Sequence, residues 1–226
     1  MSGRRRPHGA TRFIGALGAA GLTLALGCSI PFDTGPRDAG RATGPSNDRA
    51  TDTGTGDSRA MLYLVKDDLM AGAIRDVTDR QPNTLAEALA AQPDAAARSV
   101  GLVSQIPPGL EVRSIRRTDD GLIIDLSDVF DDVIGTARQE AVAQFVFTLG
   151  DSDVVRTFQF RIDGRPVLIS TPARGDVPEV GECDFVGLLP TDDELRTLTL
   201  TDLVERGMRT RRDVVLNRCP NSQSEG

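Results

Sequence analysis

Side chains able to do nucleophilic, acid–base or metal chemistry are scarce in this 226-residue chain. Its one histidine, His8, lies in an N-terminal segment that we expect to be removed, so the mature chain would lack the base of Ser-His and Cys-His catalysis. It would also lack the imidazole ligands of catalytic zinc sites. The acidic residues Asp125, Asp128, Asp131 and Asp132 could hold a hard cation through oxygen ligands, but their spacing matches no calcium loop. We expect no metal, no cofactor and no enzymatic activity.

Cys28 is the side chain with the clearest predicted chemistry. It follows a segment with four early arginines and an apolar run from Phe13 to Gly27, which is shorter than the roughly 20 residues that span a membrane. This order is typical of a secretory signal, and its final residues LALGC resemble a bacterial lipobox. We therefore expect residues 1–27 to be a lipoprotein signal peptide, cleavage between Gly27 and Cys28, and lipid on the Cys28 thiol. The alternatives are an uncleaved anchor, or an ordinary signal with an incidental cysteine.

The two remaining cysteines, Cys183 and Cys219, are expected to form a disulfide. An exported domain meets an oxidising environment, in which two spare cysteines commonly pair. The alternative is a pair of buried thiols. A bridge here would close the C-terminal region onto itself.

Charge and composition define the surroundings of the folded part. The chain carries 33 acidic and 26 basic residues, a formal net charge of −7, so we expect no nucleic-acid partner. Residues 28–60 are rich in Gly, Pro, Thr, Ser and Asp and cannot bury enough apolar surface to offset chain entropy. They predict a flexible, disordered linker with a typical reach of about 30 Å from a membrane anchor.

The central stretch of the folded domain runs from Ser104 to Phe130. Pro107, Pro108 and Gly109 predict a rigid corner, followed by a strand that contains Leu110, Val112 and Ile115. Asp119-Asp120-Gly121 predicts a hairpin turn, since Asp-Gly suits the positive φ of such turns. Alternating apolar residues from Leu122 to Leu126 predict the returning strand.

Two helices and further strands surround this hairpin. Thr84 with Glu87, and Thr136 with Gln139, have the spacing of capping boxes that open helices, and Gly150 suits the end of the second helix. Residues 61–66, 73–78, 154–162 and 167–169 predict strands, with Pro166 marking a sheet edge. The order β-β-α-β-β-α-β-β predicts an α+β fold: a mostly antiparallel sheet with two helices packed on one face.

The succession of PPG corner, strand, DG turn, strand, D-L-S and Phe130 resembles the core of the GerMN domain, found in sporulation and spore-germination lipoproteins and in related actinobacterial ones. The run FVFTLGDSDVVRTFQFRIDGRPV resembles the closing part of that domain. The resemblance spans residues 61–170 and leaves residues 171–226 as a C-terminal extension. It implies a lipid-anchored module on the extracytoplasmic face of the bacterial cytoplasmic membrane, which binds or scaffolds proteins of an envelope complex without catalysis.

Arg113, Arg116 and Arg117 form the candidate docking surface for an envelope protein, because they follow one another in a central strand of an acidic chain. A solvated face is the alternative for each of them. Arg209, Arg211 and Arg212 predict a solvated helix end, or a contact with anionic headgroups or an acidic partner. The alternative functions are an envelope hydrolase, disfavoured by the missing histidine, and a small-molecule-binding lipoprotein, which a deep apolar pocket near the sheet would favour.

Overall fold

A computed structural model describes residues 58–119, 121–150 and 155–219, all of them within one compact unit, Asp52–Gly226. The expected signal peptide, the cleavage site at Gly27 and Cys28, and the expected linker up to residue 57 lie outside the described residues. None of the described helices has the length and apolarity that a membrane span requires.

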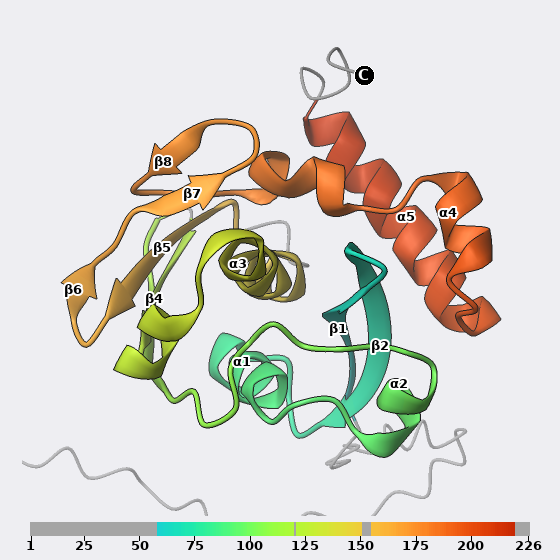
Figure 1. Ribbon diagram of the computed structural model, residues 1–226, viewed down its shortest axis with the longest axis horizontal. Helices are drawn as coiled ribbons and strands as arrows, with labels where there is room; N and C mark the ends of the chain where they lie inside the picture. The colour runs from blue at the N-terminus through green and yellow to red at the C-terminus, as the bar shows by residue number, and fades with distance from the viewer. Residues whose placement is uncertain (1–57, 120, 151–154, 220–226) are drawn as a thin grey trace, which may run out of the picture. The chain divides into compact units, whose positions relative to one another are not determined.

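The described residues form eight strands and seven helical segments (Figure 1). In chain order they are β1 (Ser58–Lys66), β2 (Leu69–Val77), α1 (Pro82–Ala90), α2 (Ala95–Ser99), β3 (Val112–Arg117), β4 (Gly121–Leu126), η1 (Asp128–Asp132), α3 (Gly135–Leu149), β5 (Thr157–Ile162), β6 (Arg165–Pro166), β7 (Ile169–Thr171), β8 (Gly175–Val177), η2 (Glu182–Leu188), α4 (Asp192–Thr197) and α5 (Asp202–Arg218). The predicted α+β class and the predicted order of strands and principal helices are confirmed.

Strands β1 and β2 form a hairpin that is longer than the sequence indicated. Asp67 and Asp68 both have positive φ, 52° and 63°, and Lys66 pairs directly with Leu69 across this two-residue turn. As a result β2 begins at Leu69, four residues before the expected strand. β1 begins at Ser58, inside the segment that we expected to be linker.

The remaining strands form separate sheets instead of the single sheet that we expected. β3, β4, β5 and β6 lie side by side in this order, and β7 pairs with β8. The pairing is antiparallel, as expected, except that β4 and β5 run parallel. The parallel pair follows from connectivity, because α3 returns the chain to the same end of the sheet before β5 begins.

Helix α3 lies between the β1–β2 hairpin and the β3–β6 sheet, and Figure 1 views it almost along its axis. The ring of Phe147 lies 5.6 Å from that of Tyr63 on β1, whereas Phe145 lies 6.2 Å from Phe160 on β5. Every residue from 140 to 149 is buried. A helix covered on all sides in this way forms the centre of the core.

Two helices begin earlier than their predicted capping boxes. Helix α1 starts at Pro82 after Gln81, and α3 starts at Gly135 after Ile134, so Thr84 and Thr136 lie inside the helices. Proline is favoured in the first turn, where its missing N–H costs nothing, and this favours the start at Pro82. Gly150 is the C-cap of α3, as predicted.

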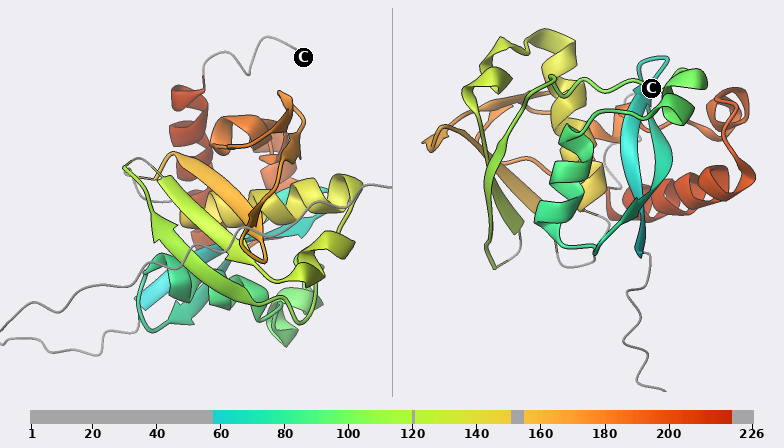
Figure 2. Two further views of the ribbon diagram at one scale, coloured as in Figure 1. Left: turned by 90° about the vertical axis from the view of Figure 1, so that its left-hand side faces the viewer. Right: turned by 90° about the horizontal axis from the view of Figure 1, so that it is seen from below.

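The C-terminal extension is folded and packs onto the rest of the domain. A disulfide joins Cys183 of η2 to Cys219 after α5, with the two Cα atoms 5.4 Å apart. Helix α5 packs across the β1–β2 hairpin (Figure 2, right), with Gly207 next to Met61 of β1. A Cβ atom added at Gly207 would lie 2.5 Å from Cε of Met61, so a larger residue here would displace the end of the Met61 side chain.

Candidate binding surfaces

The three arginines of the predicted docking surface all lie on β3, and all are exposed. β3 ends the strand order of its sheet, so among the described strands it pairs with β4 alone. An edge strand of this kind presents backbone N–H and C=O groups that a further strand can pair with.

Strand pairing gives Arg116 and Arg117 opposite orientations. Arg116 lies opposite Ile123, whereas Arg117 lies opposite Leu122, which is buried in the core. Because successive side chains of a strand point to opposite faces, Arg116 is directed to the outer face and Arg117 to the inner side of the sheet. There Arg117 lines a small cavity of about 180 Å³, as Arg80 does.

Arg113 differs again, because its Nη2 atom lies 2.8 Å from Oδ1 of Asp163 in the turn between β5 and β6. Both side chains are partly exposed, so the ion pair contributes at most about 1 kcal/mol and can be exchanged for another carboxylate. The three arginines therefore share an exposed edge strand without forming one flat patch.

The free edge of β1 is closed, in contrast to that of β3. The N–H of Tyr63 donates to Oγ1 of Thr148 at 3.0 Å, and the side-chain amide of Gln144 donates to the Tyr63 carbonyl at 3.0 Å. Two residues further along β1, Val65 exchanges two backbone hydrogen bonds with Val103. These contacts leave that edge unavailable to a partner strand.

The buried polar residues of α3 were not predicted. Glu140, Gln144 and Thr148 recur every four residues and are at most 3% exposed. A polar stripe with this spacing usually indicates the solvent-facing side of a helix. The one feature of the sequence that pointed to burial was the apolar residues on both sides of the stripe. Burial, followed by the nearby charge of Asp68, raises the pKa of Glu140 above its ordinary value.

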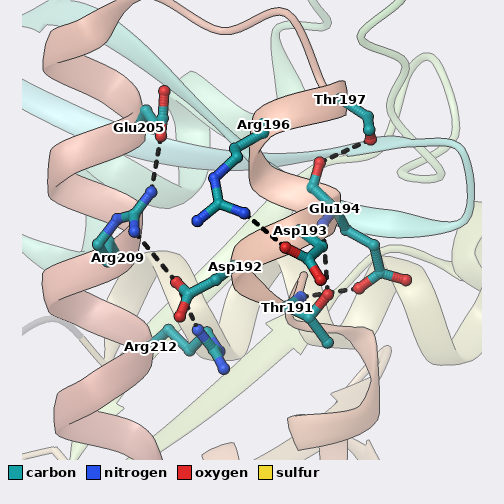
Figure 3. A network of polar contacts seen from close by, with 9 residues as sticks. All are labelled: Thr191, Asp192, Asp193, Glu194, Arg196, Thr197, Glu205, Arg209 and Arg212. Atoms are coloured by element: carbon teal, nitrogen blue, oxygen red, sulfur yellow. Dashed lines mark hydrogen bonds and ion pairs between the residues drawn. The ribbon is translucent and has the colours of Figure 1, made fainter.

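The basic cluster on α5 pairs internally. Arg209 and Arg212 both reach Oδ1 of Asp192, at 3.4 and 2.9 Å, and Arg209 also contacts Glu205 at 2.7 Å (Figure 3). In the same figure Thr191 and Glu194 form a capping box that opens α4. The expectation of a solvated helix end is wrong for these residues, because they lie within α5 and join it to α4. The alternative of a contact with anionic headgroups or an acidic partner stays a prediction.

Arg211 is buried and pairs with the buried carboxylate of Glu182 and with the Gly150 carbonyl. Arg218 lies 3.5 Å from the same carboxylate. Arg174 binds both carboxylate oxygens of Asp184, at 2.5 and 2.7 Å. These ion pairs join η2 to α5 and to the β7–β8 turn within the extension, and the hydrogen bond from Arg211 to Gly150 joins α5 to the end of α3.

The acidic residues that we considered for a cation site have other contacts in the structure. Asp125 accepts a hydrogen bond from the Gly164 N–H at 2.9 Å, and Asp131 lies 3.9 Å from Arg138. Within the described ranges, no group of three or more His, Cys, Asp or Glu side chains has an arrangement that could hold a metal ion.

A groove of about 570 Å³ lies between the β1–β2 hairpin and α5. The sequence indicated neither the groove nor the full helix that forms one wall, although Val204, Met208 and Val215 have helical spacing. A larger cavity of about 700 Å³ adjoins the disulfide and the Arg174–Asp184 pair. The residues that line each space come mainly from the extension and the strands it covers.

Comparisons with known proteins place this fold in a family. The family model of Germane, described as sporulation and spore germination, matches residues 52–168, more than half of the chain. The chain belongs to this family, and the resemblance to GerMN domains is confirmed. No curated protein matches the chain.

Three solved structures are similar to this chain at low identity. The tandem GerMN domains of the sporulation protein GerM from Bacillus subtilis are 19% identical with a TM-score of 0.44, covering 56% of this chain and 47% of that one. The match thus spans about half of the tandem structure. The first GerMN domain of the same protein is 20% identical with a TM-score of 0.41, covering 54% and 92%. A protein described as a candidate lipoprotein from Clostridium perfringens is 20% identical with a TM-score of 0.37, covering 57% and 90%.

Proposed function

We propose that this chain is a lipid-anchored, non-catalytic docking module on the extracytoplasmic face of the cytoplasmic membrane, where it binds a protein of a cell-envelope complex. The observation that carries the proposal is the open, arginine-bearing edge of β3 in an acidic protein. Arg116 has no ion pair within the described part of the chain, and the pair of Arg113 is exposed enough to exchange. An acidic, extended segment of a partner would add to the sheet and complement both charges.

The described polar clusters support a role in binding over catalysis. The buried carboxylates of Glu182 and Asp184 are paired with Arg211 and Arg174. The buried side chains of Gln144 and Thr148 bond to the backbone of Tyr63 and so join α3 to β1. Buried groups used in this way stabilise the fold, and an ion pair whose members are mutually satisfied is a poor proton donor or acceptor.

A photo-cross-linking residue placed at Ser114 tests the docking edge. Ser114 is exposed on β3 between Arg113 and Arg116, so in intact cells we expect ultraviolet light to join it to one partner protein. The matched control is the same residue at Ser99, which is exposed on α2 and should give no such product. Equal products from both positions, or none from Ser114, would contradict docking at this edge.

The anchor is tested separately by changing Cys28 to Ala. The arginine-rich start, the apolar run and the Gly27-Cys28 junction support acylation at this thiol. We expect the Cys28→Ala variant to incorporate no radiolabelled fatty acid, whereas a Cys183→Ala, Cys219→Ala variant should be labelled normally. Continued labelling of Cys28→Ala would remove the anchor from the proposal.

A further inference from the structure

The groove between the β1–β2 hairpin and α5 combines an apolar lining with positive charge. Met61 of β1 and Val214 of α5 contribute to its lining, together with Ala60 and Gly207. Its volume of about 570 Å³ falls within the range of small-molecule sites, which are mostly apolar with a few polar groups that orient the ligand.

Two large apolar side chains at this groove are exposed to solvent. Ile74 of β2 is 36% exposed and Leu203 of α5 is 55% exposed, and both belong to the groove lining. These two come from different elements and lie at one site, so they extend the apolar lining toward solvent. A ligand with an alkyl portion would cover them, and the burial of apolar surface would favour its binding.

The charge of the lining is entirely positive. It includes Arg59, Arg80, Arg206 and Arg211 but no carboxylate, although the chain has more acidic than basic residues. Arg211 is occupied by Glu182, and Arg59 pairs with Asp76 at 3.3 Å.

Arg206 and Arg80 are the two guanidinium groups of the lining that have no ion pair in the described part of the chain. Arg206 is exposed, and neither arginine has a carboxylate partner among the described residues. Arg80 donates to the backbone carbonyl of Arg59, which fixes it at the groove and leaves its charge unneutralised. A planar guanidinium can bind both oxygens of a carboxylate.

We propose that this groove binds a long-chain fatty acid, with the carboxylate at Arg80 and Arg206 and the alkyl chain along Met61, Val214 and Leu203. The positive charges of the lining select an anion, and its apolar side chains select an alkyl chain attached to that anion. This site lies on α5 and the β1–β2 hairpin, so it is independent of docking at β3.

The test uses the full chain in phosphatidylcholine nanodiscs with a photoreactive palmitate analogue. After illumination, peptide mapping should locate the label in peptides that contain Met61 or Val214. Unlabelled palmitate should compete, and hexadecanol, which has the same chain without the charge, should not. We expect an Arg80→Gln, Arg206→Gln variant to lose at least fivefold of this labelling, whereas an Arg98→Gln, Arg196→Gln variant should keep it.

A second pair of variants tests the apolar part without altering charge. Leu203→Ser should lower labelling at least threefold, whereas Leu168→Ser, at a residue 60% exposed outside the groove, should not. The proposal would be overturned if the label appeared only in other peptides, if the groove variants left the labelling unchanged, or if hexadecanol competed as well as palmitate. Absence of label would also overturn it, because the groove would then be empty or filled by the chain's own N-terminal segment or by a second copy.

Discussion

At the scale of single residues, buried polar side chains bond to particular backbone groups and so help to fix which elements pack together. Gln144 contacts three backbone or side-chain groups: its Oε1 accepts from the Gln105 N–H at 2.8 Å, and its amide reaches Tyr63 and Ser104. Sequence patterns predicted the apolar neighbours of Gln144 but not its burial, because helical spacing alone does not distinguish a buried polar stripe from a solvent-facing one. The placement depends on β1 and the 103–105 segment, which are far away in sequence.

Glu140 provides a test of this burial through pH. Its pKa is raised in the folded chain, so the unfolded chain releases the proton first, and the folded state loses stability as pH rises past the ordinary value of 4.5. Glu140→Gln removes the charge, and we therefore expect a more stable protein at pH 7, with a gain that shrinks toward zero below about pH 4. Urea denaturation at several pH values measures this difference.

Glu194 is the matched control, with the opposite sign. The backbone N–H and then the hydroxyl of Thr191 lower the pKa of Glu194, so its charged form stabilises the folded state above the ordinary pKa, and this stabilisation is lost as pH falls. Glu194→Gln should therefore weaken the protein at pH 7. Two variants with the same sign of effect would contradict the assigned environments.

At the scale of elements, the turns and the order of strands could be predicted, but the division into sheets could not. The β3–β4 turn lies where it was predicted, since the Thr118 N–H donates to the Gly121 carbonyl at 2.9 Å, and Gly150 ends α3 as expected. Gly121 itself does not have the positive φ that was expected of it: it is the first residue of β4, where a Cβ atom would lie 2.2 Å from the Thr157 carbonyl oxygen. Local turn chemistry predicts such points because it acts over a few residues. Separation of the β1–β2 hairpin from the β3–β6 sheet depends on α3 lying between them, which no local pattern indicates.

Thr148→Val tests how α3 closes the edge of β1. Valine preserves the shape of threonine, but it leaves the Tyr63 N–H without its 3.0 Å acceptor in a buried position. We expect a loss of about 1–3 kcal/mol in the free energy of unfolding, measured by urea denaturation. Thr210→Val, on an exposed part of α5, should change it by less than about 0.5 kcal/mol. A Thr148→Val variant as stable as the parent would show that the edge does not need this contact.

At the scale of the whole molecule, the extension contributes to the family domain and does not stand apart from it. The disulfide from Cys183 to Cys219, with a separation of 36 residues, closes a loop worth up to about 4 kcal/mol on the chain-entropy model. Together with the buried Glu182–Arg211 pair, it joins α5 to η2, and α5 in turn packs against β2. The sequence predicted the cysteine pair from the expected compartment, but the groove at α5 required the tertiary arrangement.

The arrangement leaves β3 as an open edge with exposed arginines, whereas the free edge of β1 is closed by Thr148, Gln144 and Val103. Docking at β3 is therefore the central claim about function. It requires positive charge on this strand and is independent of any catalytic group.

The most direct measurement changes Arg113, Arg116 and Arg117 together to Ser and compares in-cell cross-links with those of the parent. We expect this variant to fold, to keep its lipid and to lose most of its cross-links to the partner. A control with Arg98, Arg156 and Arg196 changed to Ser removes the same charge from other exposed positions and should keep them. Cross-links that persist unchanged in the β3 variant, or that disappear equally in both variants, would contradict docking at this edge.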